Sequence, residues 1–131
     1  MRRLIVIFVS ICVLPAAVTA KDRLGDRWHF FSRDRFHCQY YYDKESMVYT
    51  NELTKVWYKI RCPKKAPFEV YETTVLTEID CSKRLHHQLQ WTGIKQDGSE
   101  MLDNEPKVWG EIQPETWIEA LYKKVCPILK F

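Results

Sequence analysis

The chain has 131 residues and a formal net charge of +3, and 46% of its residues are hydrophobic and 14% aromatic. This length fits one domain of ordinary size. The small net charge argues against nucleic acid as the main partner, because nucleic-acid-binding domains usually carry a strongly basic stripe.

The first twenty residues, MRRLIVIFVSICVLPAAVTA, have the order of a secretory signal peptide, with two arginines, an apolar run and small residues ending at Ala20. The apolar run of residues 4–13 is shorter than the roughly 20 residues that span a bilayer. A lipid anchor at Cys12 is the weaker alternative, because Ile11 stands where a small residue is expected. We therefore expect secretion through the inner membrane and a mature domain of residues 21–131 with no membrane-spanning segment.

Four cysteines remain after the signal peptide: Cys38, Cys62, Cys81 and Cys126. In an oxidising compartment they are expected to form disulfides rather than to bind metal or act as nucleophiles. Four cysteines allow three pairings. The chain contains no Cys-x-x-Cys sequence, which argues against a redox-active pair.

Most of the mature chain alternates aromatic or β-branched segments with turn residues, which is typical of antiparallel strands. In residues 55–61 apolar positions alternate with lysine and arginine, so one face of this strand is expected to be buried. Asp97-Gly98 is a hairpin-turn sequence. We expect strands over residues 28–31, 38–42, 47–50, 55–61, 68–79, 85–91 and 101–102.

A single helix is expected at the end of the chain. Pro114 suits its first position, Glu115 suits its positive dipole end, and Pro127 would stop it. The apolar positions with helical spacing are Trp117, Ile118, Leu121, Tyr122 and Val125. Strands followed by one helix predict an α+β domain, with an antiparallel sheet and one C-terminal helix packed on a face.

An ordered set of motifs runs through nearly the whole mature chain. It comprises Tyr40-Tyr41-Tyr42-Asp43-Lys44-Glu45-Ser46, Val56-Trp57-Tyr58-Lys59, Glu78-Ile79-Asp80-Cys81, Trp109-Gly110-Glu111-Ile112-Gln113-Pro114-Glu115 and Val125-Cys126. This order resembles the surface-adhesin protein E-like domain, a family of small secreted bacterial proteins.

The resemblance implies an antiparallel sheet of about six strands with a C-terminal helix, and a disulfide between Cys81 and Cys126. Cys38 and Cys62 then form an additional pair that departs from the family pattern. The best-studied members act as outer-surface adhesins for host matrix and plasma proteins, so a host matrix or envelope protein is the expected partner. The resemblance and the edge strands also suggest a homodimer.

Two chemical interpretations of polar residues compete with structural ones. The histidines His29, His37, His86 and His87 suggest a metal site. However, alternation places His87 on the face of Leu89 and Trp91, which favours packing. Glu78 and Asp80 lie on one face of a strand and could act as an acid–base pair. A hydrogen-bonded turn with Arg84 as the ion-pair partner is favoured instead, and no catalytic motif occurs.

Trp91, Trp109 and Trp117 are expected in the core, whereas Trp57 shares its strand face with Lys55 and Lys59. An exposed tryptophan flanked by cations is a candidate contact for a protein partner. The alternative is that other elements cover it while the lysines reach solvent. The loop residues Lys64 and Lys65 are further candidates, for acidic glycans or proteins.

The sequence therefore predicts a secreted, disulfide-stabilised cell-envelope binding protein that resembles a bacterial surface adhesin, with no enzymatic activity and no cofactor. The alternative function is a periplasmic structural or interaction module. The expected location is the periplasm or the outer cell surface.

Overall fold

The computed structural model describes residues 27–126. The predicted signal peptide of residues 1–20, the alternative anchor at Cys12 and the helix stop at Pro127 lie outside the described residues.

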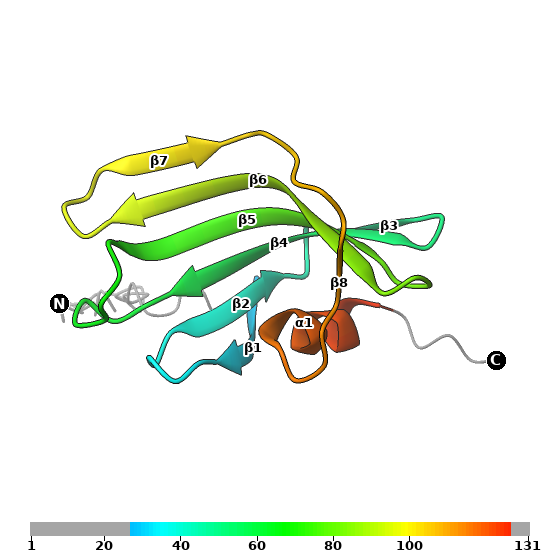
Figure 1. Ribbon diagram of the computed structural model, residues 1–131, viewed down its shortest axis with the longest axis horizontal. Coiled ribbons are helices and arrows are strands. Elements are labelled where there is room, and N and C mark those ends of the chain that lie inside the picture. Colours follow the sequence, from blue (N-terminus) through cyan, green and yellow to red (C-terminus); the bar gives the residue numbers. More distant parts are fainter. Residues whose placement is uncertain (1–26, 127–131) are drawn as a thin grey trace, which may run out of the picture.

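A single antiparallel sheet dominates the domain (Figure 1), in the order β1-β2-β4-β5-β6-β7, and it confirms the α+β class. Two short strands add to this path: β3 pairs with β4, and β8 pairs with β6. The sheet therefore has eight strands rather than about six. The strands are β1 (Trp28–Arg33), β2 (Gln39–Asp43), β3 (Val48–Thr50), β4 (Leu53–Arg61), β5 (Val70–Asp80), β6 (Leu85–Lys95), β7 (Glu100–Asp103) and β8 (Gly110–Glu111).

The three long strands β4, β5 and β6 form the middle of the sheet, and β4 shows the predicted alternation. Val56 and Tyr58 are buried, whereas Lys55 is exposed and Trp57 is half-buried. A strand with this alternation packs against another layer of the protein on one face only. Along β5 the same rule buries Val75, Thr77 and Ile79.

A β-bulge between β5 and β6 changes the faces that the sequence predicts. Leu76 pairs with Gln90, but the next residue, Thr77, pairs with Gln88, so Leu89 is the extra residue. Because one extra residue reverses the alternation, His87 lies on the opposite face from Trp91. The expectation that the two residues share a face is therefore wrong.

The helix α1 (Trp117–Val125) begins later than predicted. Thr116 is the N-cap, and its side chain accepts a hydrogen bond from the backbone N–H of Glu119. Pro114 and Glu115 precede the cap, and Glu115 has a left-handed φ of 60°. The acidic residue that complements the helix dipole is therefore Glu119, whereas Lys123 and Lys124 occupy the last turn as predicted.

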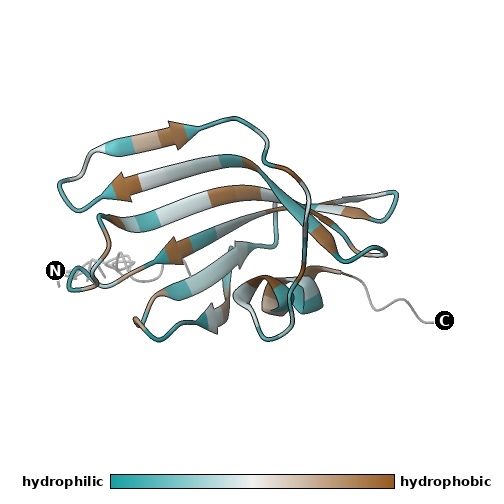
Figure 2. Ribbon diagram, viewed as in Figure 1, coloured by the Kyte–Doolittle hydropathy of each residue, from teal (hydrophilic) through white to brown (hydrophobic). Residues whose placement is uncertain are grey.

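The core lies between α1 and one face of the sheet. Ile118, Leu121 and Val125 from the helix join Val56, Tyr58, Val75 and Ile79 from β4 and β5, with Cys81 and Ile112. Figure 2 shows brown, hydrophobic segments on the helix and on the strands beside it.

Two disulfides each join two separate parts of the fold. Cys81, which follows β5, is joined to Cys126, the C-cap of α1, as the family resemblance implies. Cys38, before β2, is joined to Cys62, after β4, with a Cα–Cα distance of 4.0 Å. One bond thus attaches the helix to the sheet, and the other joins the β1–β2 turn to the β4–β5 loop.

Candidate functional site: the helix-free face of the sheet

The face of the sheet opposite α1 carries Lys55, Trp57 and Lys59, because these positions alternate with the buried ones of β4. The register extends this face across the sheet: Lys59 pairs with Tyr41, which pairs with Phe30. We call the resulting surface the helix-free face. Its side chains are Trp28, Phe30, Tyr41, Lys55, Trp57, Lys59, Leu76, Glu78 and His87.

Aromatic rings form one part of the helix-free face. Phe30 is 53% exposed and meets Tyr41 edge to face, with ring centroids 6.0 Å apart. The Lys59 ammonium lies 4.5 Å from the ring centroid of Trp28 and 3.4 Å from a carboxylate oxygen of Glu72. Contacts on both sides hold Lys59 in place. Large amphipathic rings beside cations are the side chains that protein interfaces favour.

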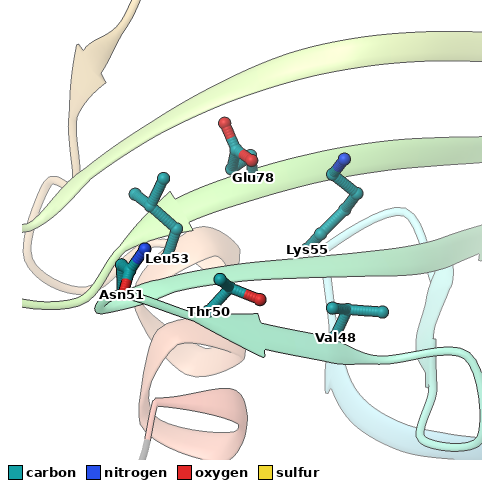
Figure 3. Close-up of a pocket in the computed structure, with 6 residues that line it drawn as sticks. All are labelled: Val48, Thr50, Asn51, Leu53, Lys55 and Glu78. Atoms are coloured by element: carbon teal, nitrogen blue, oxygen red, sulfur yellow. The ribbon is translucent and has the colours of Figure 1, made fainter.

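A shallow hollow continues this face between β3, β4 and β5 (Figure 3). Lys55 and Glu78 are direct cross-strand neighbours, and both point into the hollow. Its volume is about 240 Å³, below the roughly 300 Å³ at which pockets for small ligands begin. The hollow therefore suits a side chain of a protein partner better than an enclosed small molecule.

His87 of β6 lies on the helix-free face beside Glu78, its cross-strand neighbour. Its Nε2 lies 2.9 Å from a carboxylate oxygen of Glu78, and its Nδ1 lies 3.2 Å from the backbone oxygen of Lys107. Trp109 stacks on the imidazole with ring centroids 3.7 Å apart, yet remains 41% exposed. The expectation that Trp109 lies in the core is therefore wrong, because it covers His87 from the outside of the sheet.

Glu78 and Asp80, which the sequence suggested as an acid–base pair, make structural contacts instead. Asp80 accepts hydrogen bonds from the backbone N–H groups of Lys83 and Ser82, and these bonds, the one from Lys83 most of all, lower the pKa of its carboxyl group. The guanidinium of Arg84 does not pair with Asp80, contrary to expectation. It binds the carboxylate of Glu119 on the helix at 2.9 Å.

The other histidine of β6 faces the covered side of the sheet. His86 pairs with Ile79, and burial, assisted by the charge of neighbouring His87, lowers the pKa of His86. Adjacent residues of a strand point to opposite faces, so the two histidines do not converge. Within residues 27–126, no three His, Cys, Asp or Glu side chains gather where they could hold a metal ion.

The remaining predicted contacts, Lys64 and Lys65, lie away from the helix-free face. They are exposed in the β4–β5 loop, beyond Cys62 at the end of β4. Figure 1 shows this loop at the same end of the sheet as the β1–β2 turn. The structure therefore divides the predicted contact residues into two groups, with Lys55, Trp57 and Lys59 in one and the loop lysines in the other.

Sequence reasoning assigned three aromatic residues of the helix-free face only to strands, because a strand pattern does not show which residues of other strands lie beside them: Trp28, Phe30 and Tyr41. It also missed that Trp109 covers His87, because Trp109 follows a loop whose course no periodicity reveals. Over the part of the chain that the structure covers, we find no helix with the length and apolarity needed to cross a membrane.

Comparison with known proteins identifies the family. Residues 28–127 match the family model described as Surface-adhesin protein E, which confirms the resemblance seen in the sequence motifs. No curated protein and no solved structure matches the chain. The matched range begins at the first residue of β1 and includes the whole sheet and α1. Because this match covers well over half of the sequence, the chain belongs to the surface-adhesin protein E family.

Proposed function

We propose that the protein is secreted, acts without catalysis at the cell surface, and binds a protein partner through the helix-free face. The observation that carries the proposal is the combination of exposed or half-exposed aromatic rings and cations on a sheet face that α1 leaves open. Contiguous exposed patches of this kind on a protein surface often mark interaction sites. Family membership supports the same function.

The absence of catalysis is part of the proposal and rests on how the acidic groups are used. Glu78 is engaged by His87, and Asp80 by the backbone of its own turn. Both carboxylates are thus engaged in structural contacts rather than left available as an acid–base pair. A binding role requires only the surface itself.

Location is the first test. Intact cells of the native bacterium are treated with protease, and the envelope is then fractionated. We expect digestion of the protein on intact cells. Protection until the outer membrane is permeabilised would instead place the protein in the periplasm and support the structural module as its function.

The second test addresses the face itself. Purified protein is applied to wells coated with fibronectin, laminin or collagen IV, and bound protein is quantified. We expect Trp57→Ala and Lys55→Glu to reduce binding at least about tenfold, as truncation of central interface residues does. Lys124→Glu on α1 is the matched control, because it reverses one exposed charge on the other side of the molecule. Equal loss in the control would contradict a role for the helix-free face.

A further inference from the structure

The end of the sheet at the Cys38–Cys62 disulfide gathers positive charge from two separate loops. Arg33 and Arg35 are exposed at the β1–β2 turn, and Lys64 and Lys65 are exposed in the β4–β5 loop. Among the described residues, none of these four forms an ion pair. The disulfide between the loops prevents these like charges from moving apart freely, so repulsion is retained in the folded protein.

Both loops have a fixed conformation. The carboxylate of Asp34 accepts hydrogen bonds from the backbone N–H groups of Phe36 and Cys38 and from the hydroxyl of Tyr40. Burial, and then this bond to Asp34, raises the pKa of Tyr40 to about 12. The acidic group of the turn is thus occupied internally. In the second loop, the N–H of Ala66 bonds to the oxygen of Pro63 and closes a tight turn.

The side chains of Arg33 and Arg35 each lie over an aromatic ring. The guanidinium of Arg33 lies 5.9 Å from the ring centroid of Phe30, and that of Arg35 lies 4.8 Å from the ring centroid of Phe36. Aromatic stacking leaves the guanidinium N–H groups pointing outward in a planar fork. Such a fork matches the oxygens of a sulfate or carboxylate group with two parallel hydrogen bonds.

A hollow of about 270 Å³ lies between the two loops, lined by His37, Gln39, Arg61, Cys62 and Pro63. Arg61 shares the carboxylate of Glu72 with a second cation, Lys59, so this carboxylate neutralises at most one of the two. The amide oxygen of Gln39 accepts a bond from Tyr41, which leaves its NH₂ group able to donate. The hollow therefore offers donors and positive charge to an anionic group.

We propose that the Cys38–Cys62 end of the sheet is a binding site for a sulfated polysaccharide. The whole chain has a net charge of only +3, so its field is local and suits a short run of sulfates better than a long duplex backbone. A lipid surface fits less well, because Phe36 and Phe68 pack against each other at 5.0 Å and Arg35 covers the Phe36 ring, which leaves only Phe68 partly exposed for insertion. This site adjoins the Lys59 end of the helix-free face, because Arg33 lies over Phe30 and Arg61 shares Glu72 with Lys59, and it goes beyond the protein-binding function proposed above.

The test uses heparin octasaccharide as the probe, titrated into the purified protein at several salt concentrations. We expect binding that weakens with salt. For Arg35→Ala/Lys64→Ala we expect affinity at least about tenfold lower and a log–log salt slope smaller by about two, if the relation known for DNA applies to this polyanion. Lys83→Ala/Lys124→Ala is the matched control, because it removes two exposed cations elsewhere.

The disulfide provides a variant that changes geometry without changing charge. We expect Cys38→Ser/Cys62→Ser to bind heparin several-fold more weakly, because the two loops are then free to separate. The charge variants test the site even if this variant unfolds, which circular dichroism and the melting temperature reveal. No binding at low salt, equal loss in the control pair, or tighter binding to anionic vesicles or to a DNA duplex than to heparin would overturn the proposal. Intact heparin binding by Trp57→Ala would separate this site from the helix-free face.

Discussion

The two faces of the sheet differ in what their side chains do. On the covered face, α1 buries Leu121 completely against Val56 and Ile79, which are also fully buried. On the helix-free face, Phe30 is 53% exposed and Trp57 is half-buried. Both faces carry large apolar groups, but only one removes them from water. Burial supplies most of the free energy of folding, so the covered face is expected to determine stability and the open face is available for contacts.

The most damaging change is expected where the helix is attached to the covered face. Replacing the Cys81–Cys126 disulfide by Cys81→Ala/Cys126→Ala opens a loop with a sequence separation of 45 residues. The chain-entropy model gives a loss of about 4 kcal/mol in the free energy of unfolding. The buried site of Cys81 adds a packing defect to this loss.

Urea denaturation followed by circular dichroism measures this effect. The control is Cys38→Ala/Cys62→Ala, whose sequence separation is 24 residues and whose loss in the same model is about 3.5 kcal/mol. We expect the helical signal to weaken before the sheet signal only in the first variant. Loss of the two signals together in both variants would show that the helix is not held separately.

A leucine pair compares the faces directly. Leu121→Ala removes a fully buried side chain from the core and is expected to cost about 3 kcal/mol. Leu76→Ala on the helix-free face removes a half-buried side chain, and about 1 kcal/mol is expected. Urea denaturation of the two variants and the wild type measures both losses. Equal losses in the free energy of unfolding would mean that the helix-free face contributes to stability as much as the covered face does and is not free for a partner.

A buried carboxylate at the end of β2 predicts an acid-sensitive contribution. Asp43 is 1% exposed; burial by itself raises its pKa, but hydrogen bonds from Arg27, Ser46 and the N–H of Glu45, with the charge of Arg27, lower the pKa overall. The folded state therefore holds the ionised form more tightly than the unfolded state does. This stability is present above the unfolded pKa of about 4 and is lost as pH falls through the lower folded pKa.

Asp43→Asn is expected to cost about 2 kcal/mol at pH 7, because its amide cannot replace the charged hydrogen bonds. The difference between this variant and the wild type should shrink as pH falls below about 4. Urea denaturation at pH 7, 5, 4 and 3 measures it. A difference that stays constant across these pH values would show that the charge of Asp43 contributes nothing.

The sequence predicted the features that depend on local periodicity. The alternation of β4 placed Lys55, Trp57 and Lys59 on one face, and helical spacing placed Leu121 in the core. Irregular features that no local pattern shows were missed. The bulge at Leu89 is invisible to a strict period of two, and it moved His87 to the other face.

The helix start shows a different cause of error. Proline at the first helical position is a sound preference, but Thr116 supplies a side-chain cap three residues before Glu119, and that cap sets the boundary. The chain before it turns through Glu115 with a positive φ, which sequence reasoning did not anticipate. Local competition between two helix-start signals thus decided the outcome.

The smallest expected effect on stability is also the sharpest test of the comparison between the faces. Phe30 and Phe31 are adjacent in β1, but Phe30 is 53% exposed whereas Phe31 packs against the core and meets Tyr40 and Tyr42 edge to face. Phe30→Ala should cost less than about 1 kcal/mol, and Phe31→Ala about 3 kcal/mol. If the helix-free face binds a partner, Phe30→Ala should cost more free energy in binding to the matrix-coated wells than in unfolding. A variant that loses stability but keeps full binding would instead assign Phe30 to the fold.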